Sequence, residues 1–166
     1  VAGQAGIRAT VGLIVIDFPS AWANDTDGYL DRAAAVHDLF RNDPLVQTAF
    51  APHAPYSVND QALTRVATLA SELDLPVHMH VHETVAEVSG SLDSFGVRPL
   101  ARLQDAGLMD PSLIAVHMTQ LTDAEVDAMA SAGGKVVHCP QSNLKLASGH
   151  CPVGALHDAG ITVALG

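Results

Sequence analysis

Three histidines at alternating positions, followed by a glutamate, form the densest cluster of reactive side chains in the sequence. In the segment HMHVHE, we expect His78, His80 and His82 to share one face of a strand, because side chains two residues apart point the same way. Neighbouring pairs lie about 6.6 Å apart and can converge on one metal ion, whereas the outer two cannot do so easily. Each imidazole taken singly is more simply a buried polar group, but the cluster favours a metal site with at most two of them. Glu83 is placed to move protons for a metal-bound water, unless it is an ordinary solvated carboxylate.

Three further histidines follow apolar runs elsewhere in the chain. His53 follows VQTAFAP, His117 follows LIAV, and His138 follows KVV. In a β/α barrel the carboxyl ends of all strands face one mouth, so we expect these residues to converge with the HMHVHE cluster. The remaining histidines are expected to be surface or packing residues: His37, His150 and His157.

The elements that must position these side chains alternate along the chain between apolar runs and amphipathic segments. The predicted strands are Ala9–Asp17, Val46–Ala51, Val77–His82, Leu113–His117, Lys135–His138 and Ile161–Leu165. The predicted helices are Thr26–Arg41, Val58–Leu73, Pro99–Ala106, a helix opened by the capping box Thr122–Glu125 and ended by Gly133, and Val153–Ala159. The first strand is expected to be buried on both faces.

Two segments are predicted to be loops because they are rich in turn-forming residues. Ser89 and Gly90 are placed in a polar loop, and Asn143 in another loop, where it either forms a turn or contacts a substrate. The repeated tripeptide His-Cys-Pro at Cys139 and Cys151 could indicate a zinc site, but neither cysteine has the closely spaced second cysteine of structural zinc sites.

Composition limits the class of protein. The chain has 166 residues, of which 48% are hydrophobic and 16% charged, a balance typical of one folded domain rather than a disordered chain. The net charge of −10 disfavours binding to nucleic acid or to an anionic membrane surface. No apolar run reaches the roughly 18 residues of a membrane span, the first residues do not resemble a signal peptide, and two cysteines do not indicate an oxidising compartment. We therefore expect a cytoplasmic protein.

The alternation of strands and helices predicts an α/β fold with a parallel sheet. A doubly wound sheet and a β/α barrel both fit, but no glycine-rich phosphate loop follows the first strand, which favours the barrel. A complete barrel takes about 250 residues. We therefore expect residues 1–166 to be a single partial TIM-barrel domain of about six strands, truncated at both ends.

Four segments together resemble the amidohydrolase superfamily: APHAPYSV, MHVHET, AVHMTQLT and VVHCPQSNLKLASG. More narrowly, they resemble its triazine hydrolase-like branch and the 5′-methylthioadenosine/S-adenosylhomocysteine deaminases, over nearly the whole chain. The resemblance implies a metal-dependent β/α barrel with one zinc, in which a metal-bound hydroxide attacks C6 of the adenine ring of a purine nucleoside and ammonia leaves.

Position by position, the resemblance assigns a role to four residues. It implies that His80 is a zinc ligand, that Glu83 carries protons and contacts the substrate, that His53 binds the substrate, and that His117 hydrogen-bonds near the attacking hydroxide. The family's other zinc ligands would lie outside this chain, which implies that His78 and His82 are not ligands.

The sequence leaves other functions open. Another hydrolase of the superfamily, of the triazine, chlorohydrolase or guanine deaminase type, would share His80, Glu83 and His117. A non-catalytic fragment, stable only with a partner or in a longer chain, is the alternative from a different class. The resemblance also implies that arginines along the first strand reach a carboxylate tail in some relatives. Here only Arg8 lies near that strand, which favours methylthioadenosine over a homocysteine-bearing substrate. Whether the protein forms a homo-oligomer is also open.

Overall fold

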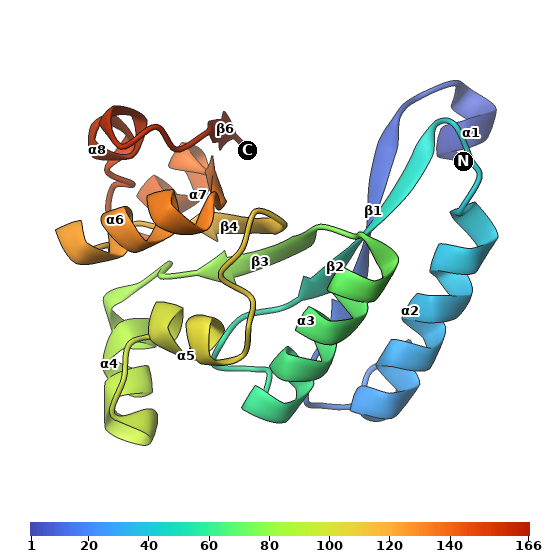
Figure 1. Cartoon of the computed structure of the whole chain (residues 1–166), viewed down its shortest axis with the longest axis horizontal. Coiled ribbons are helices and arrows are strands. Elements are labelled where there is room, and N and C mark those ends of the chain that lie inside the picture. Colours follow the sequence, from blue (N-terminus) through green and yellow to red (C-terminus); the bar gives the residue numbers. More distant parts are fainter.

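Six strands form one parallel sheet whose spatial order, β1-β2-β3-β4-β5-β6, is their order along the chain (Figure 1). The structure is a computed structural model that describes all residues, 1–166. The strands are β1 Ala9–Val15, β2 Val46–Pro52, β3 Val77–Val81, β4 Leu113–His117, β5 Lys135–His138 and β6 Val163–Leu165. All five neighbouring pairs are parallel. The prediction of about six parallel strands alternating with helices is confirmed.

Helices occupy every connection between consecutive strands, and α2 and α3 run side by side next to β1 and β2 (Figure 1). The helices are α1 Ala2–Ala5, α2 Thr26–Phe40, α3 Asp60–Leu73, α4 Val85–Phe95, α5 Pro99–Asp105, α6 Asp123–Ala132, α7 Pro140–Lys145 and α8 Val153–Asp158. A sheet without strand reversals brings the carboxyl ends of all strands to one edge.

Side chains cap the starts of α3 and α6, and the predicted ends of α6 are confirmed. The Asn59 side chain accepts a hydrogen bond from the Ala62 N–H at 2.9 Å and begins α3. Thr122 and Glu125 form the predicted capping box of α6, and Gly133 ends that helix with φ of 70°. Side-chain oxygens at these positions satisfy N–H groups that have no partner within the helix.

The prediction of a polar loop around Ser89 and Gly90 is wrong, because both residues lie within helix α4. Thr84 caps this helix by accepting a hydrogen bond from the Glu87 N–H at 3.1 Å. Val88 is buried on its inner face. A good N-cap and one buried face outweigh the low helix propensity of serine and glycine at exposed positions.

The prediction that the first strand is buried on both faces is also wrong. Thr10, Val11 and Gly12 are exposed, since β1 lies at an edge of the sheet and pairs only with β2. The last predicted strand is shorter than expected, because pairing begins only at Val163.

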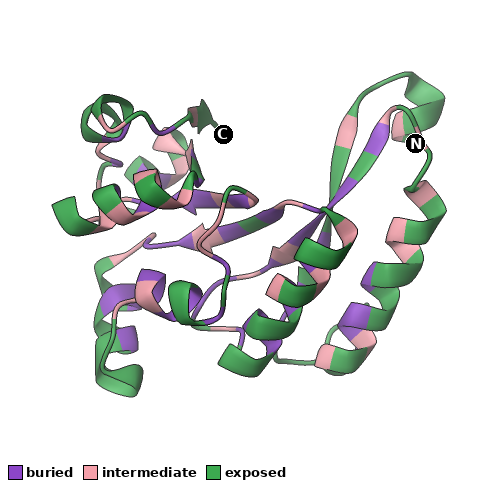
Figure 2. Ribbon diagram, viewed as in Figure 1, coloured by how far each residue is buried: buried purple, intermediate pink, exposed green.

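The core lies between the sheet and the helices that cover it (Figure 2). Its fully buried side chains include Phe50 of β2, Leu63 of α3, Met79 of β3, Leu103 of α5 and Met129 of α6. Burial of one such side chain contributes about 1.5–3 kcal/mol, so this core fixes the strands whose ends carry the histidines. None of the helices combines the length and apolar character that crossing a membrane requires.

Candidate active site

Three of the predicted histidines meet at the carboxyl ends of β2, β3 and β4. The rings of His53 and His80 lie 5.3 Å apart between centroids, and the rings of His80 and His117 lie 5.5 Å apart and are stacked. His53 directly follows β2, and His117 is the last residue of β4. Parallel neighbouring strands therefore bring together residues that are distant in the sequence.

His80 is oriented by the backbone of His53. Its Nδ1–H donates to the His53 carbonyl oxygen at 2.7 Å. In the neutral ring, a hydrogen on Nδ1 means that Nε2 carries only a lone pair. A histidine binds a metal ion through such an unprotonated nitrogen.

Glu83 and His117 face each other across the site. Glu83 Oε1 lies 3.5 Å from His117 Nε2. On the other side of the ring, His117 Nδ1–H donates to Asn143 Oδ1 at 2.7 Å. Because Nδ1 carries the hydrogen that is bonded to Asn143, Nε2 is the nitrogen of His117 that faces the Glu83 carboxylate.

Asn143 is not in the predicted loop. It lies in α7 and is 1% exposed, so its contact with His117 replaces the turn or substrate contact expected from the sequence. Pro140 at the first helical position is the sequence signal for α7 that the turn-forming composition of this segment obscured.

His53 is held by Ser57, whose hydroxyl oxygen lies 2.8 Å from His53 Nδ1. The Ser57 hydroxyl donates its own proton to the Ala54 carbonyl at 3.2 Å, so the His53 Nδ1–H is the donor to Ser57. Burial lowers the pKa of His53, and the neighbouring His80 lowers it further. His53 is therefore neutral near pH 7, with Nε2 free to accept a hydrogen bond.

The expectation that His78, His80 and His82 share one face fails at His82. His82 has φ of 53°, just past the end of β3, and its ring is fully buried instead of facing the mouth. Its Nε2 accepts a hydrogen bond from the Leu100 N–H at 3.2 Å, and burial lowers its pKa to about 4. His78 is exposed on β3.

The other histidines and the two cysteines do not add to the cluster of His53, His80 and His117. His138 ends β5, half-buried, and its Nδ1 has no hydrogen-bond partner. His150 and His157 are exposed, and His37 Nδ1 lies 2.9 Å from the Thr48 hydroxyl, as expected for surface and packing residues. Burial raises the pKa of Cys151 to about 11, so its thiol stays protonated at neutral pH.

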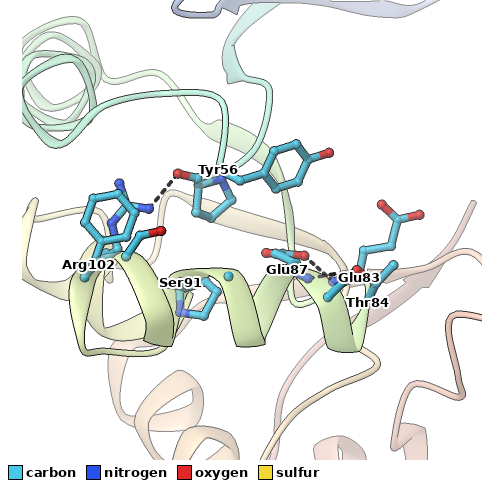
Figure 3. A pocket seen from close by; sticks show the side chains of 12 residues that line it. Tyr56, Glu83, Thr84, Glu87, Ser91 and Arg102 are labelled. Carbon is cyan, nitrogen blue, oxygen red and sulfur yellow. Dashed lines mark hydrogen bonds between the residues drawn. The ribbon is translucent and has the colours of Figure 1, made fainter.

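A cavity of about 520 Å³ lies beside Glu83, between the segment that follows β2 and helices α4 and α5 (Figure 3). Tyr56 lines it, and burial together with the charge of Glu83 raises the pKa of the Tyr56 hydroxyl. Arg102 donates to the Pro55 carbonyl at 2.6 Å and to Asp60 at 2.6 Å, which fixes this segment next to His53. Sequence reasoning missed both residues because neither belongs to a local pattern.

The backbone at the ends of β3 and β4 adopts a conformation that L-residues rarely take. His82, His117 and Met118 have φ of 53°, 79° and 49°. Such residues cost about 1–3 kcal/mol each and gather at functional sites, where surrounding contacts hold them. One strained residue, His82, directly precedes Glu83, and the other two are His117 itself and the residue after it.

The residues of this chain fit one part of a zinc site and not a complete one. The hydrogen of the neutral His80 ring is on Nδ1, which leaves Nε2 unprotonated and able to bind a metal ion. No group of three or more histidine, cysteine, aspartate or glutamate side chains is arranged to hold a metal. Catalytic zinc takes about three protein ligands, so a zinc here needs ligands beyond those of this chain.

The model of the amidohydrolase family matches residues 2–166. The chain belongs to the amidohydrolase family. The resemblance inferred from the four sequence motifs is therefore confirmed, and the six-stranded sheet is part of the β/α barrel of this family.

Curated relatives of the chain are 5-methylthioadenosine/S-adenosylhomocysteine deaminases. The protein of Teredinibacter turnerae is 47% identical over 163 residues, and that of Saccharophagus degradans is 45% identical over 165 residues. These matches cover 98% and 99% of this chain but 37% of each relative. The chain thus spans little more than a third of the length of these proteins.

Solved structures share the fold. An adenosine deaminase from Xanthomonas campestris with bound zinc is 57% identical, with a TM-score of 0.98 over 99% of this chain and 38% of its own. A zinc-bound atrazine chlorohydrolase from Arthrobacter aurescens is 21% identical, with a TM-score of 0.91 over 99% of this chain and 39% of its own. The second likeness shows the fold alone.

Proposed function

We propose that the protein carrying this chain hydrolyses the 6-amino group of an adenosine derivative, 5′-methylthioadenosine or S-adenosylhomocysteine, to give the inosine derivative and ammonia. The observation that carries the proposal is the convergence of His53, His80, Glu83 and His117 at one edge of the sheet. The identity of 47% to a deaminase of these substrates supports the choice of reaction.

Each of the four side chains has a role that follows from its contacts. Glu83 carries a proton from the attacking water to the purine ring as the amine departs, because its carboxylate is partly exposed and paired with an imidazole. His117 hydrogen-bonds near the attacking water through Nε2, because Asn143 occupies Nδ1 on the opposite side of the ring. His53, neutral and held by Ser57, binds a polar group of the substrate through Nε2.

One zinc ion completes the proposed site, with His80 as the ligand from this chain. When bound, zinc supplies Lewis-acid activation of the attacking water. The hydrogen bond from His80 Nδ1 to the His53 carbonyl keeps Nε2 in the form that binds the ion. The adenosine deaminase that is 57% identical was solved with bound zinc, which supports the choice of metal.

The variant Glu83→Gln in the full-length protein tests the role of the carboxylate. It keeps the size of the side chain but removes its capacity to carry a proton, so turnover should fall by on the order of 10²-fold or more while zinc remains bound. Steady-state ammonia release and zinc content by mass spectrometry check the two halves. Glu72→Gln, on the exposed face of α3, is the matched control and should leave both unchanged. Near-normal turnover of Glu83→Gln would remove Glu83 from the mechanism.

A substrate panel distinguishes the proposed reaction from those of other amidohydrolases. We expect loss of the 6-amino group from 5′-methylthioadenosine and S-adenosylhomocysteine, followed by the fall in absorbance as adenine becomes hypoxanthine. Turnover of guanine or a chlorotriazine, with none of the adenosine derivatives, would instead assign the protein to another hydrolase type of the family.

A further inference from the structure

The position of Glu83 depends on a short link that belongs to neither a strand nor a helix. β3 ends at Val81, and α4 begins only at Val85. Within this link His82 has φ of 53°, a conformation that is costly for any residue with a side chain. The link keeps its shape only if neighbouring groups hold it.

The side chain of Glu87 holds the amide groups of this link. Its Oε1 accepts from the His82 N–H at 2.9 Å, and its Oε2 accepts from the Glu83 N–H at 2.7 Å. Glu87 is 8% exposed, and its carboxylate is turned toward the backbone at the start of α4 (Figure 3). Each of the two Glu87 oxygens thus accepts one backbone N–H, an arrangement that suits a carboxylate because both of its oxygens are acceptors.

The segment after β4 holds the carbonyl groups of the same link. The N–H groups of Thr119 and Gln120 donate to the His82 carbonyl at 3.0 and 3.2 Å. The Thr119 hydroxyl donates to the Glu83 carbonyl at 2.7 Å. All backbone polar groups of His82 and Glu83 are therefore paired, and the Glu83 side chain faces His117 from a fixed base.

A second Thr-x-x-Glu motif in this chain shows how the motif behaves as a helix cap. In α6 the Glu125 carboxylate returns to the N–H of Thr122, the first residue of its own motif, at 2.9 Å. In α4 the Thr84 hydroxyl caps as usual, but the Glu87 carboxylate extends one and two residues upstream of Thr84. Glu87 thus binds the segment that carries Glu83 as well as capping a helix.

We propose that Glu87 is a positioning residue that fixes Glu83 relative to His117. The inference rests on the proposed function, in which Glu83 carries the proton. Glu87 acts through the backbone of Glu83, since both of its oxygens are occupied by amide groups. A misplacement of a catalytic group by about 1 Å can lower the rate on the order of 10²-fold.

The first test is Glu87→Gln in the full-length protein. Glutamine has nearly the same shape, but one acceptor oxygen becomes an NH₂ group that faces a backbone N–H. We expect kcat to fall about 10- to 100-fold while KM changes less than about threefold and zinc stays bound. Asp25→Ala is the matched control, because it removes the side-chain cap of α2, a helix that packs on β1 and β2. It should lower the thermal midpoint and leave kcat unchanged.

A double variant separates positioning from a general loss of structure. If Glu87 acts through Glu83, then Glu87→Gln lowers kcat much less when Glu83 is already glutamine. An equal loss in both backgrounds overturns the proposal, and so does a single Glu87→Gln variant with the kcat of the unaltered protein.

Amide hydrogen exchange gives a readout that does not depend on activity. Glu87→Gln should speed exchange at the His82 and Glu83 amides by about tenfold or more, with the Met79 amide in β3 unchanged. Unchanged exchange at His82 and Glu83 overturns the proposal. Faster exchange in a protein that deaminates no adenosine derivative contradicts the proposed function alone. If Glu87→Gln does not fold, Glu87→Asp, which withdraws the carboxylate by one methylene, is measured in the same way.

Discussion

The chemistry of the site depends on which nitrogen of each imidazole carries the proton. Backbone and side-chain acceptors fix this for His80 and His117, whose Nδ1–H groups donate to the His53 carbonyl and to Asn143. Both rings then present Nε2 lone pairs at the end of the sheet where Glu83 lies. Under the proposed function the two rings take different roles, His80 as the zinc ligand and His117 beside Glu83.

At this scale we predict that His80→Ala, but not His78→Ala, removes zinc from the full-length protein. His80 projects beside His53 and His117, whereas His78 is exposed two residues earlier on the same strand. Removing a metal ligand should weaken binding at least as much as removing a residue that only orients it. The affinity for zinc should therefore fall by about 10²-fold or more. Zinc content after dialysis, measured by mass spectrometry, checks the pair. Retention of zinc by His80→Ala would show that another side chain is the ligand.

At the scale of elements, α4 follows β3 and forms one wall of the cavity. The glycine within this helix and the glycine that ends it differ in conformation. Gly90 lies inside the helix, whereas Gly96 ends it with φ of 72°. A Cβ added at either position would meet no atom within 4 Å, so packing does not distinguish them.

We therefore predict opposite effects of alanine at the two glycines of α4. Gly90→Ala should raise the free energy of unfolding by about 0.5–1 kcal/mol, because alanine loses less backbone entropy within a helix. Gly96→Ala should lower it by about 1–2 kcal/mol, because the left-handed conformation penalises a Cβ. Urea midpoints followed by circular dichroism check the signs. A stabilising Gly96→Ala would contradict the positive φ at the end of α4.

At the scale of the whole molecule, the sheet has two open edges. β1 pairs only with β2, and β6 pairs only with β5. Val11 and Ile14 of β1 and Leu165 of β6 expose apolar side chains at these edges. Unpaired strand edges with apolar side chains are templates for pairing with another chain.

We predict that the 166-residue chain by itself associates with further copies as its concentration rises. The variant Val11→Lys should weaken this association, since a charge on an edge strand opposes pairing. Sedimentation velocity over a range of concentrations measures both. A single monomeric species at all concentrations would argue against pairing through these edges.

The order of strands and helices could be predicted from the sequence because it depends on local signals. Apolar runs and side-chain caps act over a few residues, and the structure confirms the predicted capping box at Thr122. The placement of His53 and His117 at strand ends was predictable for the same reason. Once the strands are parallel, the geometry of the sheet brings their ends to one edge.

Tertiary structure alone decided which polar groups complete the site. Asn143 meets His117 across 26 residues of sequence, and no local pattern marks that pairing. His82 turns away from its neighbours on β3 because contacts from Glu87 and from the segment after β4 hold its backbone in a left-handed conformation. These contacts join residues that are distant in the sequence. Their energy offsets the cost of the left-handed backbone at His82, which a local sequence pattern would predict to be unfavourable. The sequence therefore determines the residue types and the order of elements. The packed fold determines which nitrogen of each imidazole carries the hydrogen.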